Sequence, residues 1–323
     1  MSGPLRIRHL RSWRKAVVAG ILAASVVYTG ASAYVVSRSL RARAICPTGV
    51  PPAELGPDAL TFVNAADGAT LTGWLVPSSG DRAVVLLHGL DSDAWAATQP
   101  DLAAAYAEAG FHVLTFDLRG HGRSGGGRLS LGALERGDIR SAVDLLLNRG
   151  FAPGRIALYG TSYGAAMGLL AAAEIPEVGA VVADSAFADV RDLIASEVAR
   201  RTPVPSVFAG AIMRPGIEGV ARLFYGLDLA ALAPERVIAA IAPRPLLLIH
   251  GDGDRIVPVG HATRLKDHAA GAELWILEGQ GHASGVRDGR CNLTVSPGRA
   301  AFLERVVSFV DEAIGGEGDT LGP

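Results

Sequence analysis

The chain is poor in cysteine and nearly balanced in charge. Its 323 residues include two cysteines, Cys46 and Cys291, which are too few for a disulfide scaffold or a cysteine zinc cluster, and no C-x-x-C spacing occurs. The formal net charge is −2 and arginines are spread along the chain, so no basic face predicts nucleic-acid binding. Because the sequence also lacks an H-E-x-x-H motif, a P-loop and a cluster of metal ligands, we expect no cofactor and no metal.

Apolar residues are abundant. They make up 49% of the 323 residues, enough for one domain of about 250 residues with a sizeable core, whereas a second full domain would not fit comfortably. Residues 44–58 hold several prolines and glycines and are typical of a linker. We therefore expect a membrane or signal segment at 1–43, a linker at 44–58, a folded domain at 59–315 with an insertion at 186–243, and a flexible tail at 316–323.

The N-terminus contains an uncharged apolar run at residues 16–36, which as a helix would span about 30 Å, the thickness of a bilayer's hydrocarbon core. More basic residues precede the run than follow it, which favours a cytoplasmic N-terminus and an extracytoplasmic domain. A cleaved signal peptide is the alternative, because Ala31-Ser32-Ala33 matches an A-x-A cleavage site. Either interpretation exports the domain, so a disulfide between Cys46 and Cys291 is possible, with two unpaired thiols as the alternative.

Strand-length apolar runs alternate with alanine-rich helical stretches beyond the linker. Continuous apolar runs are typical of strands buried on both faces, so we predict a mostly parallel sheet with helices on both faces. An antiparallel hairpin around Asp67-Gly68 is expected at the edge of this sheet, formed by the first two strands. The predicted strands cover residues 60–64, 71–76, 83–87, 113–116, 156–159, 179–183, 246–249 and 274–277.

Gly-x-Ser-x-Gly occurs twice, around Ser124 and around Ser162. A nucleophile elbow requires a strand, a sharp turn and a helix, with small residues beside the serine. Only Ser162 follows a predicted strand and precedes a predicted helix rich in glycine and alanine, so it is the candidate nucleophile. Its position at a helix N-terminus makes the Tyr163 N–H a candidate oxyanion donor, and the loop after the strand at 83–87 offers the Leu90 N–H as a second. His88, in the same loop, is predicted to be structural.

A serine hydroxyl needs a histidine base and an orienting carboxylate. His282 directly follows the last predicted strand, at the sheet edge where ligands of parallel sheets bind, and is the candidate base. Asp252 and Asp254 compete as the acid after the strand at 246–249, and Asp184, at the end of another strand, is the fallback. Spacing favours Asp254 only weakly.

Residues 60–314 resemble the α/β-hydrolase superfamily, and most closely its Bem46 or ABHD13-like, prolyl-oligopeptidase-related branch. The resemblance rests on the H-G-x-x-D-x-x-V-P pattern of residues 250–258 and on residues 117–124, which are similar to the family's D-x-R-G-H-G-x-S turn. It implies an α/β-hydrolase fold, Asp254 as the triad acid, and a structural role for the turn. The helical pieces and prolines between Ser185 and Pro243, which interrupt the alternation of strands and helices, predict a helical lid insertion in this fold. The turn also contains a bare G-x-G-x-x-G pattern, but no helix is expected at its third glycine, which argues against a dinucleotide site.

These residues predict hydrolysis of a carboxylic ester through an acyl-enzyme, with a small ester or acyl compound as substrate and the membrane as a partner through the N-terminal helix. Amide, peptide or thioester cleavage and acyl transfer use the same three residues and stay open. A membrane-tethered binding protein without catalysis is the alternative from another class. Apolar residues of the insertion could line an acyl pocket, with core packing as the other explanation: Phe187, Phe208, Met213 and Phe224.

Overall fold

The structure is a computed structural model that describes residues 5–42, 49–96, 99–201, 206–283 and 298–315. It divides into two compact units. The helical unit comprises Met1–Ser39 and Ile194–Leu229, and the sheet unit comprises Leu40–Leu193 and Ala230–Pro323. Cys46 and Cys291, and with them the predicted disulfide, lie outside the described residues.

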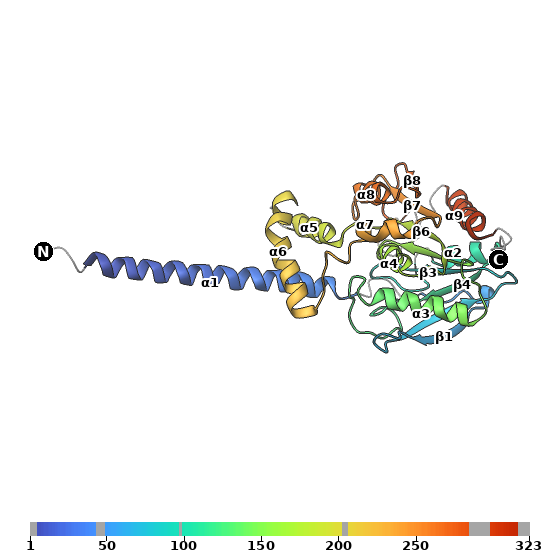
Figure 1. The fold of residues 1–323 in the computed structure, drawn as a ribbon, viewed down its shortest axis with the longest axis horizontal. Helices are drawn as coiled ribbons and strands as arrows, with labels where there is room; N and C mark the ends of the chain where they lie inside the picture. The colour runs from blue at the N-terminus through green and yellow to red at the C-terminus, as the bar shows by residue number, and fades with distance from the viewer. Residues whose placement is uncertain (1–4, 43–48, 97–98, 202–205, 284–297, 316–323) are drawn as a thin grey trace, which may run out of the picture. The chain divides into compact units, whose positions relative to one another are not determined.

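The sheet unit is built on eight strands in the order β1-β2-β4-β3-β5-β6-β7-β8 (Figure 1). The first two strands pair antiparallel, β2 also pairs antiparallel with β4, and all remaining pairs are parallel. The predicted mostly parallel sheet with an antiparallel hairpin at its edge is confirmed. The strands are β1 (Asp58–Val63), β2 (Thr70–Val76), β3 (Ala83–Leu87), β4 (His112–Phe116), β5 (Ile156–Thr161), β6 (Val178–Asp184), β7 (Leu246–Gly251) and β8 (Glu273–Leu277).

Helices cover both faces of this sheet. Helices α2 (Gln99–Glu108) and α9 (Arg299–Ile314) pack on one face, while α3 (Glu135–Asn148) and α4 (Tyr163–Ala172) pack on the other. Alternate residues of β3, β5, β6 and β7 point to each side, and nearly all of them are buried, because both faces are covered. The sheet unit also contains η1 (Ala53–Leu55), α7 (Pro234–Val237), η2 (Ile238–Ile241) and α8 (Gly260–His268).

The register brings the carboxyl ends of the central strands together. Leu87 pairs with Gly160, and Thr161 pairs with Asp184, which in turn pairs with Ile249. The loops that follow β3, β5, β6 and β7 therefore all leave the sheet at the same end, the carboxyl end of the parallel strands. The order β4-β3-β5 also reverses the direction of chain progression at β3, and such switch points are where open parallel sheets bind ligands.

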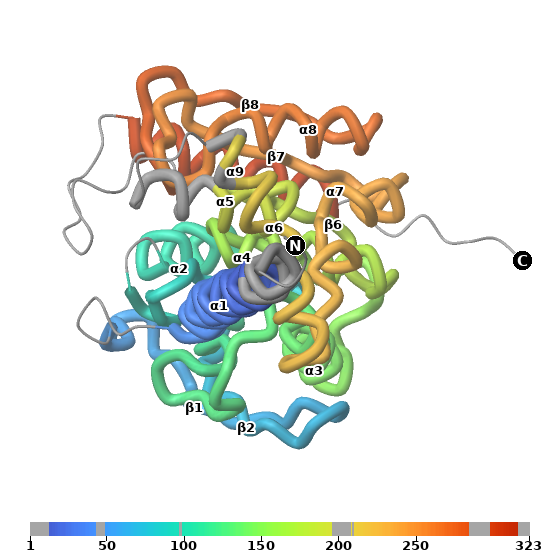
Figure 2. The backbone as a smooth tube through the Cα atoms, turned by 90° about the vertical axis from the view of Figure 1, so that its left-hand side faces the viewer, coloured from blue at the N-terminus to red at the C-terminus, as the bar shows by residue number. Residues whose placement is uncertain are grey.

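The helical unit contains α1 (Leu5–Ser39), α6 (Ser206–Tyr225) and most of α5 (Val190–Arg201). Figure 2 views α1 nearly along its axis, with α6 beside it. Within α1, Trp13–Ser39 is long and apolar enough to cross a membrane, judged by length and composition alone, and a signal sequence passes the same test. Helices α5, α6 and α7 and the short η2 all fall within the predicted insertion at 186–243.

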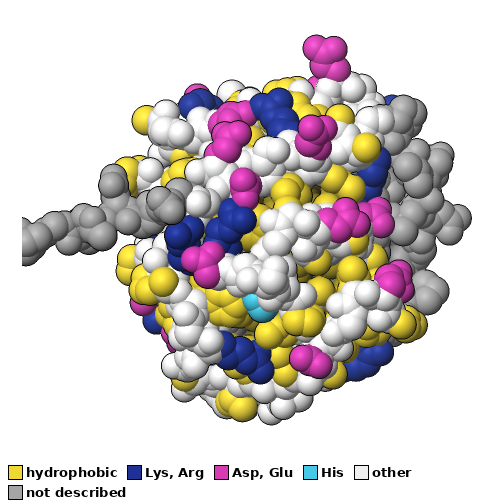
Figure 3. All heavy atoms as spheres, turned by 90° about the vertical axis from the view of Figure 1, so that its right-hand side faces the viewer, with side chains coloured by type: hydrophobic (Ala, Val, Ile, Leu, Met, Phe, Trp, Pro, Cys, Tyr) yellow, Lys and Arg dark blue, Asp and Glu magenta, His cyan; other side chains and the backbone are white. Residues whose placement is uncertain are grey.

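Charges of both signs lie on the face of the molecule drawn in Figure 3. On the face shown in Figure 3, acidic and basic side chains are interspersed with apolar ones, and no patch of a single sign covers that face.

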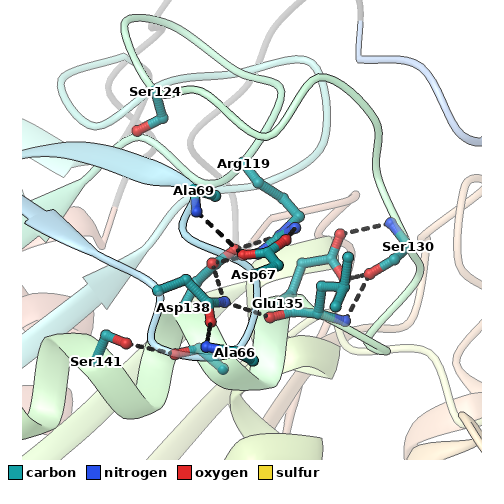
Figure 4. Close-up of polar contacts among 12 residues, drawn as sticks. Ala66, Asp67, Ala69, Arg119, Ser124, Ser130, Glu135, Asp138 and Ser141 are labelled. Atoms are coloured by element: carbon teal, nitrogen blue, oxygen red, sulfur yellow. Dashed lines mark hydrogen bonds and ion pairs between the residues drawn. The ribbon is translucent and has the colours of Figure 1, made fainter.

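A buried ion pair joins the turn after β4 to α3 and to the β1–β2 turn (Figure 4). The fully buried Arg119 donates two hydrogen bonds of 2.6 Å to the carboxylate of Asp138 on α3, and a third of 2.8 Å to Asp67 in the β1–β2 turn. The side chain of Asp138 is also fully buried, and Asn64 donates to it at 2.7 Å. The cluster draws on three segments, the turn after β4, the β1–β2 connection with Asn64 and Asp67, and α3, so it fixes the turn, the hairpin and α3 to one another.

Replacing Arg119 is expected to destabilise the protein strongly. Arg119→Met leaves the Asp138 carboxylate buried with the amide of Asn64 as its remaining side-chain donor, and breaking a buried pair typically costs about 3 to 5 kcal/mol. Chemical unfolding measures this loss. Arg123→Met is the matched control, because Arg123 is exposed and its side chain lies 5.1 Å from the ring of Trp74, a contact worth about 1 kcal/mol. Equal losses in the two variants would contradict the assignment.

Candidate active site

Ser162 lies in a strained turn between β5 and α4. Its φ of 54° and ψ of −113° are outside the regions that non-glycine residues favour. The flanking glycines permit the turn: a Cβ on Gly160 would lie 2.6 Å from the backbone of Ala165, and a Cβ on Gly164 would lie 2.3 Å from the carbonyl oxygen of Leu87. The geometry has the features of a nucleophile elbow, in which the strained turn holds the serine hydroxyl at the strand tip.

The second Gly-x-Ser-x-Gly motif has a different environment. The hydroxyl of Ser124 donates to the carbonyl oxygen of Asp117 and accepts the N–H of Thr72 at 2.9 Å. Both partners are backbone groups, so Ser124 ties the turn after β4 to β2.

His282 lies between Ser162 and Asp254. Its Nε2 is 2.8 Å from Ser162 Oγ, and its Nδ1 is 2.7 Å from Asp254 Oδ2. The loop that carries it is held by the hydroxyl of Ser185, which accepts the Ala283 N–H at 3.0 Å. The structure therefore brings together the three side chains predicted as nucleophile, base and acid, although residues 162 and 282 are 120 positions apart.

Asp254 is held as a carboxylate. Its Oδ1 accepts the N–H groups of Ile256 and Val257 at 2.8 and 2.9 Å. Burial by itself raises the pKa of Asp254, but hydrogen bonds from His250, His282 and Val257 outweigh it and hold the pKa well below its usual range. The two competing aspartates have other roles in the structure. Asp252 accepts the Gly279 N–H at 2.7 Å, and Asp184 accepts the hydroxyl of Ser185 at 2.9 Å.

His250 is a neighbour of Asp254 that was not among the residues predicted for the site. Its Nε2 donates to the Val257 carbonyl oxygen at 2.7 Å and lies 3.3 Å from Asp254 Oδ2. Burial lowers the pKa of His250, but the carboxylate of Asp254 and the Val257 carbonyl outweigh it, so the pKa is raised. The side chain thus supports the loop that carries Asp254. Its place in the H-G-x-x-D-x-x-V-P pattern was the only available signal.

Two backbone N–H groups near Ser162 are available as oxyanion donors. Tyr163 N–H is at the start of α4, and Leu90 N–H belongs to the loop after β3; neither has an acceptor within the described part of the chain. The loop passes close to the nucleophile, since a Cβ on Gly89 would lie 3.6 Å from Ser162 Cβ. Helix N-termini and such loops favour negative charge, so both groups stay candidates for this role.

Two buried histidines support the loop that carries Leu90. His88 Nδ1 donates to the Gly89 carbonyl at 2.8 Å, and its Nε2 accepts the Leu118 N–H at 2.9 Å. His121 Nε2 accepts the Asp91 N–H at 3.3 Å, and its ring packs edge-on against His88. Burial lowers the pKa of His88 to about 4, and burial together with the neighbouring His88 lowers the pKa of His121 to about 4. Both rings must therefore stay neutral to keep these acceptors.

Stability is expected to fall as the pH decreases from 6.5 towards 4. Because the pKa of each ring is lower in the folded chain than in the unfolded chain, the unfolded chain binds more protons in this window, and acidification favours unfolding. Thermal unfolding across this range measures the effect. In His121→Gln the decrease in Tm should be smaller, since glutamine does not titrate and its amide oxygen can still accept the Asp91 N–H. The exposed His268→Gln should keep the wild-type decrease, and equal behaviour of the two variants would contradict the explanation.

The side chain of Tyr163 contacts Glu135, a residue without any local sequence signal. Tyr163 Oη donates to Glu135 Oε1 at 2.9 Å, and burial together with the charge of Glu135 raises the pKa of Tyr163 well above its usual value. Glu135 also accepts the N–H groups of Ser130 and Gly132 and the hydroxyl of Ser130 (Figure 4). This buried cluster fixes the side chain of Tyr163, and the backbone N–H of Tyr163 is the first oxyanion candidate.

The predicted pocket residues are divided between the units. Phe187 is buried in the sheet unit, whereas Phe208, Met213 and Phe224 belong to α6 of the helical unit. Phe208 and Phe224 are 62% and 71% exposed. Their role as an acyl pocket stays a prediction. Within the described residues, no group of three histidine, cysteine or carboxylate side chains could hold a metal ion.

Residues 84–290 match the protein family described as the alpha/beta hydrolase family. The chain belongs to the α/β-hydrolase family. The matched range runs from β3 through β8 and includes Ser162, Asp254 and His282, so the fold expected from the sequence resemblance is confirmed.

Several relatives of this α/β-hydrolase are known. The uncharacterized protein YfhR of Escherichia coli K12 is 30% identical over 258 residues, which are 77% of this chain and 79% of YfhR. A monoacylglycerol lipase of Mycolicibacterium smegmatis is 30% identical over 231 residues, which are 62% of this chain and 80% of the lipase. A solved esterase structure from Pyrococcus furiosus has a TM-score of 0.62 at 24% identity, covering 85% of this chain and 99% of the esterase, and shares the fold.

Proposed function

We propose that the protein is a serine hydrolase that cleaves a carboxylic ester through an acyl-enzyme. The observation that supports this most is the bridging position of His282, 2.8 Å from Ser162 Oγ and 2.7 Å from Asp254 Oδ2. Membership of the α/β-hydrolase family, and the esterase and monoacylglycerol lipase among its relatives, support hydrolase activity. The strained turn at Ser162 adds support, because such strain is found where function requires it.

The proposed reaction begins with attack of Ser162 Oγ on the ester carbonyl carbon while His282 Nε2 takes the hydroxyl proton. Asp254 accepts the Nδ1–H, which fixes the tautomer and stabilises the imidazolium. The N–H groups of Tyr163 and Leu90 stabilise the negative charge on the carbonyl oxygen. The protonated His282 then gives its proton to the leaving alkoxide, and the released alcohol leaves Ser162 acylated. Water, deprotonated by the same nitrogen, hydrolyses the acyl-enzyme and restores the serine.

Matched substrates test the ester assignment. We expect the purified protein to hydrolyse p-nitrophenyl esters and to cleave the matched p-nitroanilides and thioesters more slowly. Varying the acyl group from acetate to octanoate identifies the preferred chain length. Faster cleavage of the anilide than of the ester would contradict the proposal and favour an amidase.

We further propose that the protein belongs to the Bem46 or ABHD13-like branch of the family. The H-G-x-x-D-x-x-V-P pattern of residues 250–258 supports this assignment, because its aspartate is Asp254, the carboxylate that contacts His282.

We propose that α1 is retained as a membrane anchor, with the hydrolase unit on the extracytoplasmic side. The contacts of α1 support retention. Tyr28 Oη donates to the Ile212 carbonyl oxygen at 2.6 Å and accepts the Gly216 N–H at 2.8 Å, and Ser32 is fully buried. Cleavage after Ala33 would remove both side chains and expose the part of α6 that they cover. The excess of basic residues before the apolar run supports the orientation.

The mass of the protein isolated from membranes tests retention. We expect the mass to include the N-terminal residues and the protein to remain in the membrane fraction after a carbonate wash. A soluble product that begins at Tyr34 would contradict it and establish a cleaved signal peptide.

A further inference from the structure

Helices α1 and α6 pack closely at one crossing. Tyr28 Oη bridges the Ile212 carbonyl and the Gly216 N–H, the two groups that pair with each other in a regular helix. Gly216 allows the close approach, because a Cβ there would lie 2.3 Å from Ser32 Oγ and 2.7 Å from the Tyr28 ring. Small residues at the crossing of two helices are typical of packing within membranes.

The position of this crossing along α1 determines its depth in a bilayer. Every side chain described from Trp13 to Val27 is exposed, and contacts along α1 begin at Tyr28. The uncharged residues before Tyr28, 16–27, span about 18 Å as a helix, whereas the hydrocarbon core is about 30 Å thick. If α1 crosses the core, the segment that contains Tyr28 and Ser32 must also lie within it. Whatever packs on that segment then reaches the acyl chains.

One exposed stripe of α6 is apolar. Phe208, Ile212 and Leu223 are 62%, 56% and 81% exposed, and with Pro215 and Gly219 they fall on one helical stripe without a charge. The charged residues of the helix lie beside this stripe: Arg214 and Glu218 pair with each other at 3.1 Å, and Arg222 is exposed at the margin of the stripe. In Figure 1, α6 crosses α1 steeply. A helix that crosses a membrane span in this way lies close to the membrane plane, as amphipathic interfacial helices do.

We propose that α6 is a second membrane element, whose stripe of Phe208, Ile212, Pro215, Gly219 and Leu223 lies among lipid acyl chains. The inference rests on the proposed retention of α1 as an anchor and goes beyond it. The occupant of the stripe is the bilayer itself, because the adjacent face of the same helix is fixed to the segment of α1 that must lie in the hydrocarbon. The insertion between β6 and β7 would then contact the phase in which long-chain esters dissolve.

Single fluorescent labels test the depth of α6. In a Cys46→Ser, Cys291→Ser background, Ile212→Cys and Leu223→Cys carry an environment-sensitive fluorophore, with Val26→Cys as the anchor control and the exposed Asp267→Cys as the aqueous control. The full chain is reconstituted in phosphatidylcholine and phosphatidylglycerol vesicles with or without brominated acyl chains. Brominated lipid should remove most of the emission from labels at 26, 212 and 223, while aqueous iodide should quench the label at 267.

Each other outcome overturns the proposal in a recognisable way. Iodide quenching at 212 and 223, with lipid quenching at 26, would mean that the anchor is correct and that α6 lies in water. Iodide quenching at 26 as well would mean that the anchor itself is wrong. Labels at 212 and 223 that neither quencher reaches would indicate a protein cover, such as a second copy. Because fluorescence requires no turnover, failure of the proposed esterase activity would leave this result unchanged.

Discussion

Ser162→Ala is expected to lower ester turnover by about 10⁶, the effect seen when a nucleophile of this kind is removed. The alanine lacks the oxygen that forms the acyl-enzyme. In the wild type His282 Nε2 lies 2.8 Å from the serine hydroxyl, and in the variant it has no hydroxyl proton to take. Turnover of a p-nitrophenyl ester by purified wild type and variant measures the loss. The fold should persist, because the Ser162 side chain is half-buried and an alanine removes one hydroxyl.

Ser124→Ala is the matched control for this prediction. The same Gly-x-Ser-x-Gly motif surrounds Ser124, but its hydroxyl bonds to backbone groups of Asp117 and Thr72. We expect a loss of stability of about 1 kcal/mol from the missing hydrogen bonds and an activity close to that of wild type. If Ser162→Ala stayed within about tenfold of wild type, a difference of about 1.4 kcal/mol in barrier, Ser162 could not be the nucleophile.

Asp254→Asn should lower kcat by about 10⁴, because an amide cannot stabilise the imidazolium and favours the wrong histidine tautomer. The carboxylate accepts His282 Nδ1 at 2.7 Å and also the N–H groups of Ile256 and Val257, so the asparagine fits the space but changes one acceptor into a donor. Steady-state kinetics with the same ester measures the loss.

Variants of the two competing aspartates test whether Asp254, and not Asp252 or Asp184, is the triad acid. Asp252→Asn removes charge from a residue that accepts the Gly279 N–H, and we expect kcat to stay within about tenfold of wild type. Asp184→Asn tests the remaining candidate at the end of β6. A large loss in Asp184→Asn together with a small loss in Asp254→Asn would reverse the assignment.

Features that carry a local signal are predictable from the sequence. Strands β3, β5, β6 and β7 are continuous apolar runs, because helices cover both sides, and each was found from its run. Ser162 was separated from Ser124 by the small residues that follow it, and the structure supplies the reason in the contacts of Gly164 with β3. His282 was selected by its place after the last strand.

Other features depend on contacts between distant segments and have no local pattern. The choice of Asp254 over Asp252 relied on resemblance, since both aspartates lie in one short loop. The contact of Glu135 with Tyr163 spans 28 positions, and that of Tyr28 with Gly216 spans 188. Neither pairing is signalled by periodicity or composition, because it arises only when folding brings the elements together.

Labelling with a fluorophosphonate most directly tests whether Ser162 is an activated nucleophile. The reagent phosphonylates serines that an adjacent base makes reactive, and mass spectrometry of the digested protein locates the adduct. We predict one adduct on Ser162 in wild type and in Ser124→Ala, and none in Ser162→Ala. Folded wild-type protein that stays unmodified, or an adduct on another residue, would contradict a hydrolase centred on Ser162; the unmodified protein would favour a binding protein on the same fold.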